Sequence, residues 1–209
     1  MADIGVYVER YTIRSSEELG ALTKFAAACS DRGHNCEFLF RPDLFYIPNF
    51  DAIFIRALTD PLNASYVAAR IAEIAGKRVI DDSHSILVCC DKIHMYRRLM
   101  AAGIRIPKTI FLSKRDITRD AAENAFRKLG PKLILKAPSS SFSAYVEKVE
   151  STPQFLSVAK RFTRRADRLV VQEFVPSTFD WRVTVLGEQV LFVCKYLMPG
   201  DAWKLHATV

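Results

Sequence analysis

The sequence of 209 residues lacks several features that would assign it to a class at once. No uninterrupted apolar stretch approaches the roughly 20 residues that cross a bilayer, so we expect no membrane span. The first residues, Met-Ala-Asp, carry no basic segment followed by an apolar core, and we therefore expect no secretory signal. The composition, 50% apolar and 25% charged, excludes a disordered or low-complexity protein.

Cysteines are few and show no metal-binding spacing. Their number, five, is odd, and none belongs to a CxxC pair or accompanies an HxxxH spacing. A disulfide framework and a zinc site are therefore not expected. We predict reduced, mostly buried thiols in a cytoplasmic protein. The residues concerned are Cys29, Cys36, Cys89, Cys90 and Cys194.

The best-known nucleotide and hydrolase motifs are also missing. The sequence contains no GxGxxG, no P-loop GxxxxGK[ST] and no G-x-S-x-G elbow. These absences exclude the commonest motifs, although they do not exclude nucleotide binding. The four histidines are scattered and suggest no cluster of metal ligands, so we assign no metal site.

Charge is distributed unevenly along the chain. Residues 1–90 carry 9 Lys/Arg against 12 Asp/Glu, whereas residues 91–209 carry 21 against 11. The net charge of +7 therefore belongs to the second part, whose positive field favours a polyanion such as a nucleoside triphosphate or a nucleic acid. A solvated basic helix face explains part of the excess. We see no nucleic-acid-binding motif, so nucleic acid is the less favoured partner.

The hydrophobic pattern divides the chain near residue 88. In the first part, strands expected at residues 4–8, 36–40, 52–55 and 77–80 alternate with helices that start near Ser15 and at Asp60-Pro61. This alternation predicts a parallel α/β sheet over residues 1–88. Residues 89–209 instead predict an α+β domain with antiparallel strands. Two pairs of expected strands are each joined by a turn, the first pair at 132–136 and 145–149 and the second, a hairpin, at 182–186 and 189–197.

Lys136 is the first residue to suggest chemistry. It ends the apolar strand Leu133-Ile134-Leu135, where an ammonium group is costly unless its charge has a partner. The following residues 138–143 are mostly small and polar, and such a turn can present backbone N–H groups and hydroxyls to an anion. The alternative is that Lys136 extends to the surface and the serines form a simple turn.

Two further pairs of residues leave two interpretations open. Asp91 is suited to cap a helix, and Lys92 then lies in the first turn against the helix dipole, where a bound phosphate would compensate for its charge. Asp180 and Arg182, two apart on a strand, share one face. They suit a ribose hydroxyl and a phosphate, or form a surface pair.

Together these segments resemble the ATP-grasp superfamily, and most closely the branch of the ribosomal-protein S6 glutamate ligase and glutathione-synthetase-like proteins. The resemblance rests on order and spacing over residues 80–206. The matching segments are Asp91-Lys92, residues 99–109 (Leu-Met-Ala-Ala-Gly-Ile-Arg-Ile-Pro-Lys-Thr), Leu133-Ile134-Leu135-Lys136 with Ser140-Ser141-Phe142-Ser143, Val171-Gln172-Glu173-Phe174 and Phe179-Asp180-Trp181-Arg182-Val183. It implies an α/β Rossmann-like pre-ATP-grasp domain at 1–88, followed by an α+β ATP-grasp domain at 89–209.

The resemblance also implies roles for individual residues. Lys92 and Lys136 would hold the ATP phosphates, and a loop with Ser139, Ser140, Ser141 and Ser143 would cover them. Glu173 and Phe174 would form the hinge at the adenine, and Asp180 would contact the ribose. Arg182 and Lys195 would act near the phosphate or acyl substrate, and Lys204 and His206 lie in a stretch that reaches nucleotide or substrate.

The sequence departs from the family pattern in two places. The phosphate loop is usually rich in glycine, and here serines, Ala144 and Tyr145 stand instead, which limits positive φ angles and the close approach of a phosphate. The family also binds Mg²⁺ through carboxylates near the end of the domain, but only Glu188 and Asp201 follow Arg182. We therefore expect an ATP-grasp domain incomplete at its C-terminal end: a fragment, a truncated gene product or a degenerate homologue.

The resemblance implies an activity for the complete domain. It would be an ATP-dependent carboxylate–amine ligase that joins a small-molecule or peptide carboxylate to an amine through an acyl phosphate, with ATP and Mg²⁺. One alternative is a catalytically inactive nucleotide-binding homologue or fragment, and a second is a basic nucleic-acid-binding protein. The two substrates and the oligomeric state do not follow from the sequence.

Overall fold

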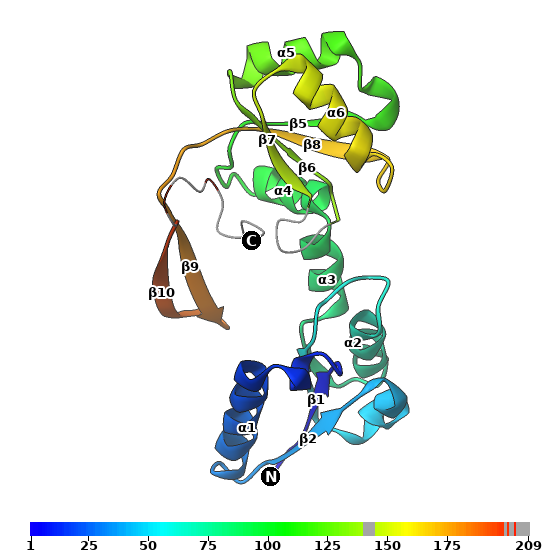
Figure 1. Cartoon of the computed structure of the whole chain (residues 1–209). Helices are drawn as coiled ribbons and strands as arrows, with labels where there is room; N and C mark the ends of the chain where they lie inside the picture. The colour runs from blue at the N-terminus through cyan, green and yellow to red at the C-terminus, as the bar shows by residue number, and fades with distance from the viewer. Residues whose placement is uncertain (140–144, 199, 201–202, 204–209) are drawn as a thin grey trace. The chain divides into compact units, whose positions relative to one another are not determined.

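The chain forms two compact units in a computed structural model (Figure 1). The structure describes residues 1–139, 145–198, 200 and 203. The first unit spans Met1–Met95 and the second Tyr96–Val209. No helix among the described residues is long and apolar enough to cross a membrane.

The first unit is built on a four-stranded parallel sheet. Its strands are β1 (Asp3–Val8), β2 (Asn35–Leu39), β3 (Ala52–Arg56) and β4 (Arg78–Ile80), in the order β2-β1-β3-β4. The parallel sheet predicted from the alternating pattern is therefore confirmed, with each strand within one or two residues of its expected position.

Helices cover both faces of this sheet. Helix α1 (Ser16–Ser30) packs Leu22 against Val6 and Val8 on one face. Tyr7 points to the opposite face, because neighbouring strand residues alternate, and lies there with alanines of α2 (Ala64–Ile74). The 3₁₀ helix Arg41–Asn49 and helix α3 (Ser83–Cys90) pack on the same face. A short 3₁₀ turn, Thr12–Arg14, precedes α1.

Helix α2 begins later than the sequence indicated. The expected start at Asp60-Pro61 is wrong, because the first helical residue is Ala64. The side chain of Asn63 accepts a hydrogen bond from the Ser65 amide (3.2 Å) and caps the helix there. Asp60 instead forms a local turn, accepting from the Leu62 amide at 2.8 Å.

The second unit is built on a four-stranded antiparallel sheet. The strands β5 (Thr109–Ser113), β6 (Leu133–Lys136), β7 (Val146–Val149) and β8 (Arg168–Glu173) have the order β5-β8-β6-β7. Helices α5 (Arg119–Leu129) and α6 (Thr152–Phe162) cover one face, as Figure 1 shows, and a 3₁₀ turn at Lys114–Asp116 precedes α5. Phe155 and Phe162 of α6 pack there against Leu133, Leu135 and Val171.

The other face of this sheet carries the polar residues. Because Leu135 and Val171 point to the helices, their neighbours Lys136 and Gln172 point away from them. Helix α4 (Lys92–Ala101) contacts this second face through Tyr96, which accepts a hydrogen bond from Lys136. The sheet therefore separates an apolar, helix-covered side from a side with a polar centre.

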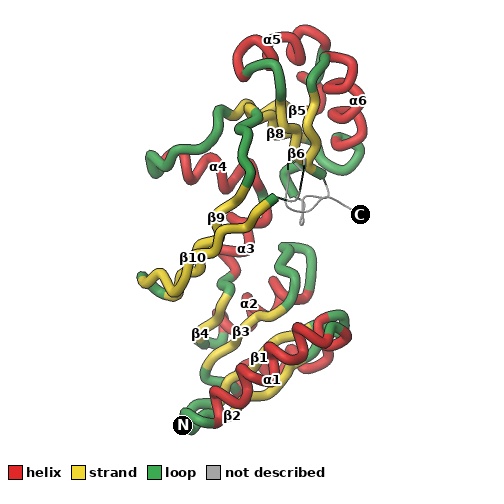
Figure 2. The backbone as a smooth tube through the Cα atoms, turned by 60° about the vertical axis from the view of Figure 1, so that its left-hand side comes forward, coloured by secondary structure: helices red, strands yellow, loops and turns green. Residues whose placement is uncertain are grey.

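A separate two-stranded hairpin follows the sheet. Strands β9 (Phe179–Leu186) and β10 (Gln189–Leu197) pair antiparallel around Gly187, with an irregularity between Val190 and Phe192 (Figure 2). The hairpin was predicted, but β9 begins three residues earlier than expected. Most of its side chains are exposed.

The prediction of mostly buried thiols is wrong. All five cysteines are free, but only Cys29 is buried and Cys89 is exposed. The reason is their position: Cys36 lies on an edge strand, and Cys89 and Cys90 end a short helix. Burial, with a further contribution from Cys29, still raises the pKa of the Cys36 thiol to about 11.

Candidate nucleotide-binding site

The ammonium group of Lys136 is held at the end of β6 by two neutral oxygens. Its Nζ donates to the Gln172 amide oxygen at 2.7 Å and to the Tyr96 hydroxyl at 2.9 Å. It also lies 5.4 Å from the centre of the Tyr96 ring, within the range of a cation–π contact. The side chain is half-buried rather than extended into solvent.

The charge of Lys136 is not neutralised by these contacts. Among the residues that the structure describes, no carboxylate forms an ion pair with it. A half-buried cation with only neutral acceptors is costly unless an anion binds it, because partial burial removes part of its hydration. The site is therefore electrostatically suited to a phosphate or another anion.

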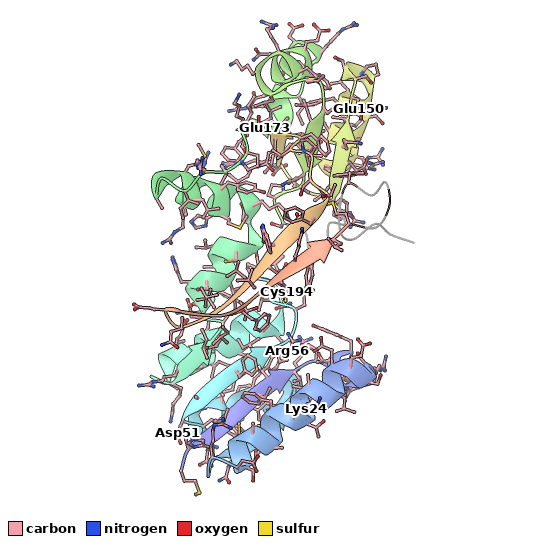
Figure 3. All side chains as sticks on the ribbon, turned by 90° about the vertical axis from the view of Figure 1, so that its left-hand side faces the viewer. Lys24, Asp51, Arg56, Glu150, Glu173 and Cys194 are labelled. Carbon is pink, nitrogen blue, oxygen red and sulfur yellow. The ribbon has the colours of Figure 1, made fainter. Side chains whose placement is uncertain are left out.

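Several chain segments meet at the end of β8, where Glu173 pairs with Leu133 at the start of β6. Glu173, which is labelled in Figure 3, bonds twice to Lys108. Its amide donates to the Lys108 carbonyl at 2.9 Å, and its carboxylate accepts from the Lys108 amide at 2.8 Å. The Phe174 amide donates to the Lys132 carbonyl at 3.1 Å, and Lys148 lies 5.3 Å from the Phe174 ring centre. Glu173 and Phe174 thus link three chain segments at the place where a hinge was predicted.

Helix α4 starts as the sequence indicated. The Asp91 carboxylate accepts from the His94 amide at 2.9 Å and caps the helix. Lys92 is its first residue and is half-buried. Tyr96, the partner of Lys136, follows Lys92 by four residues, which places both on the same face of the helix.

The hairpin separates the two cations that were assigned to catalysis. Residues two apart on a strand project to the same face, so Arg182 shares a face of the hairpin with Asp180. Residues directly paired across the two strands also share a face. Lys195 pairs with Trp181 on the other face, where its Nζ lies 4.2 Å from the Phe179 ring centre. A ligand on one face of the hairpin therefore reaches Arg182 or Lys195, but not both.

Comparisons with known proteins bear on the fold and on the resemblance of the sequence to known families. No model of a protein family matches the sequence. A glutamate–LysW ligase ArgX of Sulfolobus acidocaldarius is 26% identical over 162 residues, covering 75% of this chain and 55% of the relative. A probable alpha-L-glutamate ligase of Vibrio atlanticus is 25% identical over 197 residues, covering 86% and 64%. The chain thus spans between half and two thirds of the length of these curated relatives.

Solved structures decide the fold. A RimK domain protein ATP-grasp from Sphaerobacter thermophilus superposes with a TM-score of 0.71 at 20% identity, covering 96% of this chain and 76% of that protein. The D-alanine–D-alanine ligase from Bacillus anthracis complexed with ATP gives 0.67 at 17% identity, covering 93% and 66%. The chain therefore has the ATP-grasp fold. Its fold class and its resemblance to the glutamate-ligase branch are confirmed.

Several residues assigned from the ATP-grasp resemblance lie outside the described residues. These are Ser140, Ser141, Ser143, Lys204 and His206. Ser139 is described and forms an exposed bend after β6. The covering loop of the ATP-grasp site therefore stays a prediction.

The described part of the chain does not fit a magnesium site. Within it, no group of three or more His, Cys, Asp or Glu side chains lies close enough to hold a metal ion. Glu188 lies in the turn of the hairpin, and Asp201 is outside the described residues. We assign no step of a reaction to a metal here.

Two polar residues of the site were given no role from the sequence, Tyr96 and Gln172. A signal for Gln172 was present, because a glutamine within the apolar strand Leu-Val-Val-Gln must find hydrogen-bond partners when buried. The aromatic ring of Tyr96 on a helix carried no comparable signal, since aromatic residues at helical spacing usually face the core.

The first unit contains a hollow of its own. It has a volume of about 540 Å³ and lies at the carboxyl ends of β1 and β2. In parallel sheets, ligands bind beyond this end of the strands. Two arginines among its lining residues suit a carboxylate. The lining residues are Glu9, Arg10, Tyr11, Phe40, Arg41 and Pro42.

Proposed function

We propose that the chain is the nucleotide-binding part of an ATP-dependent carboxylate–amine ligase, with the Lys136 ammonium as a ligand of the ATP phosphates. The observation that carries this proposal is the half-buried ammonium group, which is oriented by Tyr96 and Gln172 and forms no ion pair with a carboxylate among the described residues. The ATP-grasp fold supports it, as do sequence relatives named as glutamate ligases.

The proposed chemistry transfers a phosphoryl group and then forms an amide. A substrate carboxylate attacks the terminal phosphorus of ATP and releases ADP, and an amine then displaces phosphate from the acyl phosphate. Lys136 would stabilise the negative charge on the transferred group by a fixed cation near the reacting oxygens. Arg182 and Asp180, which share a hairpin face, are the proposed contacts to phosphate and ribose.

The substrates proposed are a small-molecule or peptide carboxylate and an amine. The relatives' names make a glutamate-containing substrate pair the first to test. The arginine-lined hollow of the first unit is our candidate for binding the carboxylate before reaction.

A second function is a nucleotide-binding protein without turnover. The described residues hold no cluster of carboxylates for Mg²⁺, and this favours binding alone in the 209-residue chain. Isothermal titration with ATP in the presence and absence of Mg²⁺ separates the two functions. Binding strengthened by Mg²⁺ supports the ligase, and binding indifferent to Mg²⁺ supports the second function.

Lys136→Met tests the site itself. Loss of one charge-assisted contact should weaken ATP binding by roughly ten- to hundredfold, because hydrogen bonds to charged groups contribute about 1.5–3 kcal/mol. Lys160→Met, on the exposed face of α6, is the matched control and should leave ATP affinity unchanged. Equal, salt-dependent losses in both variants would contradict the proposal and indicate a general polyanion surface.

A further inference from the structure

We infer that Gln172 is a positioning residue that fixes the direction of the Lys136 ammonium while leaving its positive charge available to an anion. The inference rests on the proposed nucleotide site and adds to it a residue with a defined task. It depends on the contacts of one buried amide, and not on the family resemblance.

The amide of Gln172 can adopt only one orientation. The side chain is 4% exposed and bonds at both ends: Oε1 accepts from Lys136 at 2.7 Å, and Nε2 donates to the Thr109 hydroxyl at 2.8 Å. The Thr109 hydroxyl donates its own hydrogen to the Pro107 carbonyl at 2.7 Å. Its oxygen can therefore only accept from Gln172, which forces the carbonyl of the amide toward Lys136.

The backbone holds this chain of contacts in register. Gln172 lies between Thr109 of β5 and Ile134 of β6, in the central part of the sheet. A rigid strand controls the position of a side chain more closely than a loop does. A series of hydrogen bonds thus runs from the start of β5 to the ammonium group, through Pro107, Thr109, Gln172 and Lys136.

The amide matters because a carboxylate of the same shape would act differently. A glutamate at position 172 would accept the same hydrogen bond from Lys136 but would add a negative charge at 2.7 Å. That ion pair would satisfy the half-buried cation internally and repel a phosphate. Glutamine keeps the geometry without this competition, and Tyr96, the other described partner, offers a hydroxyl oxygen rather than a carboxylate.

The first experiment compares ATP and adenosine binding to the 209-residue chain. Gln172→Glu should weaken ATP binding about tenfold and leave adenosine binding unchanged, since only ATP carries the phosphates that compete with the new carboxylate. Gln172→Leu should also weaken ATP more than adenosine, because Lys136 loses a fixed partner. Gln154→Glu is the control: it adds the same charge on α6, beyond the opposite face of the sheet.

Three results of the binding experiments would overturn the inference. Equal losses for ATP and adenosine would place Gln172 on the base rather than on the lysine, and unchanged affinities would deny it any role. In a double-variant cycle, Gln172→Glu should add almost nothing to Lys136→Met, since its effect acts through Lys136. Additive losses would contradict the inference as well.

A second readout needs no nucleotide. Lysine labelled with ¹³C at Cε and incorporated during expression gives separate NMR signals without altering the ammonium group, and Lys136→Arg identifies the signal of Lys136. Gln172→Glu should raise the pKa read from that signal, because the carboxylate favours the charged form. An unchanged pKa and shift overturn the inference even if the wild-type chain binds no ATP. Failure of ATP binding with the expected pKa change would instead contradict only the proposed function.

Discussion

The four-stranded sheet and the hairpin of the second unit are made of similarly apolar strands but differ in what covers them. In the sheet, Leu135 and Val171 are fully buried beneath α5 and α6. In the hairpin, Trp181, Val183 and Val193 are each more than half exposed. Apolar sequence therefore predicts a strand in both regions, whereas a covering layer decides whether the strand contributes a core.

This difference also separates the candidate site residues. Lys136 and Gln172 lie on the covered sheet, and the packing of its other face fixes their backbone. Arg182 and Lys195 lie on the hairpin, where the described contacts are mainly with neighbouring hairpin side chains. The side chains on the sheet are therefore held in place more firmly than those on the hairpin, which lowers the cost of ordering them around a ligand.

The largest effect that would test this contrast is the loss of a core aromatic ring. Phe155→Ala removes a fully buried ring beneath the sheet and should lower the free energy of unfolding by about 3–5 kcal/mol. Phe192→Ala removes the same ring from the hairpin, where it is 53% exposed, and should cost under about 1 kcal/mol. Urea unfolding followed by circular dichroism measures both. Similar losses would show that the hairpin is covered in solution.

A smaller effect should come from the helical layer itself. Thr118 caps α5 by accepting from the Ala121 amide at 3.1 Å, so Thr118→Ala should cost about 1 kcal/mol. Thr118→Ser keeps the accepting oxygen and should restore most of the loss. Thr184→Ala, within the hairpin, is the control and should shift the urea midpoint less. Full loss in the serine variant would mean that the hydroxyl is not the stabilising group.

Much of this fold could be predicted from the sequence, and particular residues show why the other parts could not be predicted. Periodicity located the strands, and Asp91 was correctly recognised as a helix cap. The start of α2 was misplaced because Pro61 and Asn63 both satisfy rules for helix starts, and only the hydrogen bond to Ser65 distinguishes them. The lysine at position 136 was found because an ammonium ends an apolar strand. Its partner Tyr96 is 40 residues away, a pairing that only the folded sheet and helix create.

The smallest predicted effect concerns charge at the sheet edge. The Glu150 carboxylate lies 3.3 Å from Lys132 and 3.6 Å from Lys148, and the hydrogen bond from Lys132 is the main cause that lowers its pKa (Figure 3). A lowered folded pKa stabilises the fold above the ordinary value of 4.5, and this stabilisation is lost as the pH falls through the lower folded value. Glu150→Gln should therefore unfold at slightly lower urea than the wild type at pH 7, and the difference should shrink as the pH falls below 4.5 and as salt is added.

The matched control for this charge is Glu188→Gln in the hairpin turn. Among the described residues Glu188 forms no ion pair, so this variant should change the urea midpoint at pH 7 less than Glu150→Gln does. If the difference in urea midpoint between Glu150→Gln and the wild type stays constant between pH 3 and 7, its cause is the backbone around Ser151 rather than the lysines. Equal pH dependence in both variants would instead indicate that the net charge of the chain, not the paired lysines at the sheet edge, controls the response.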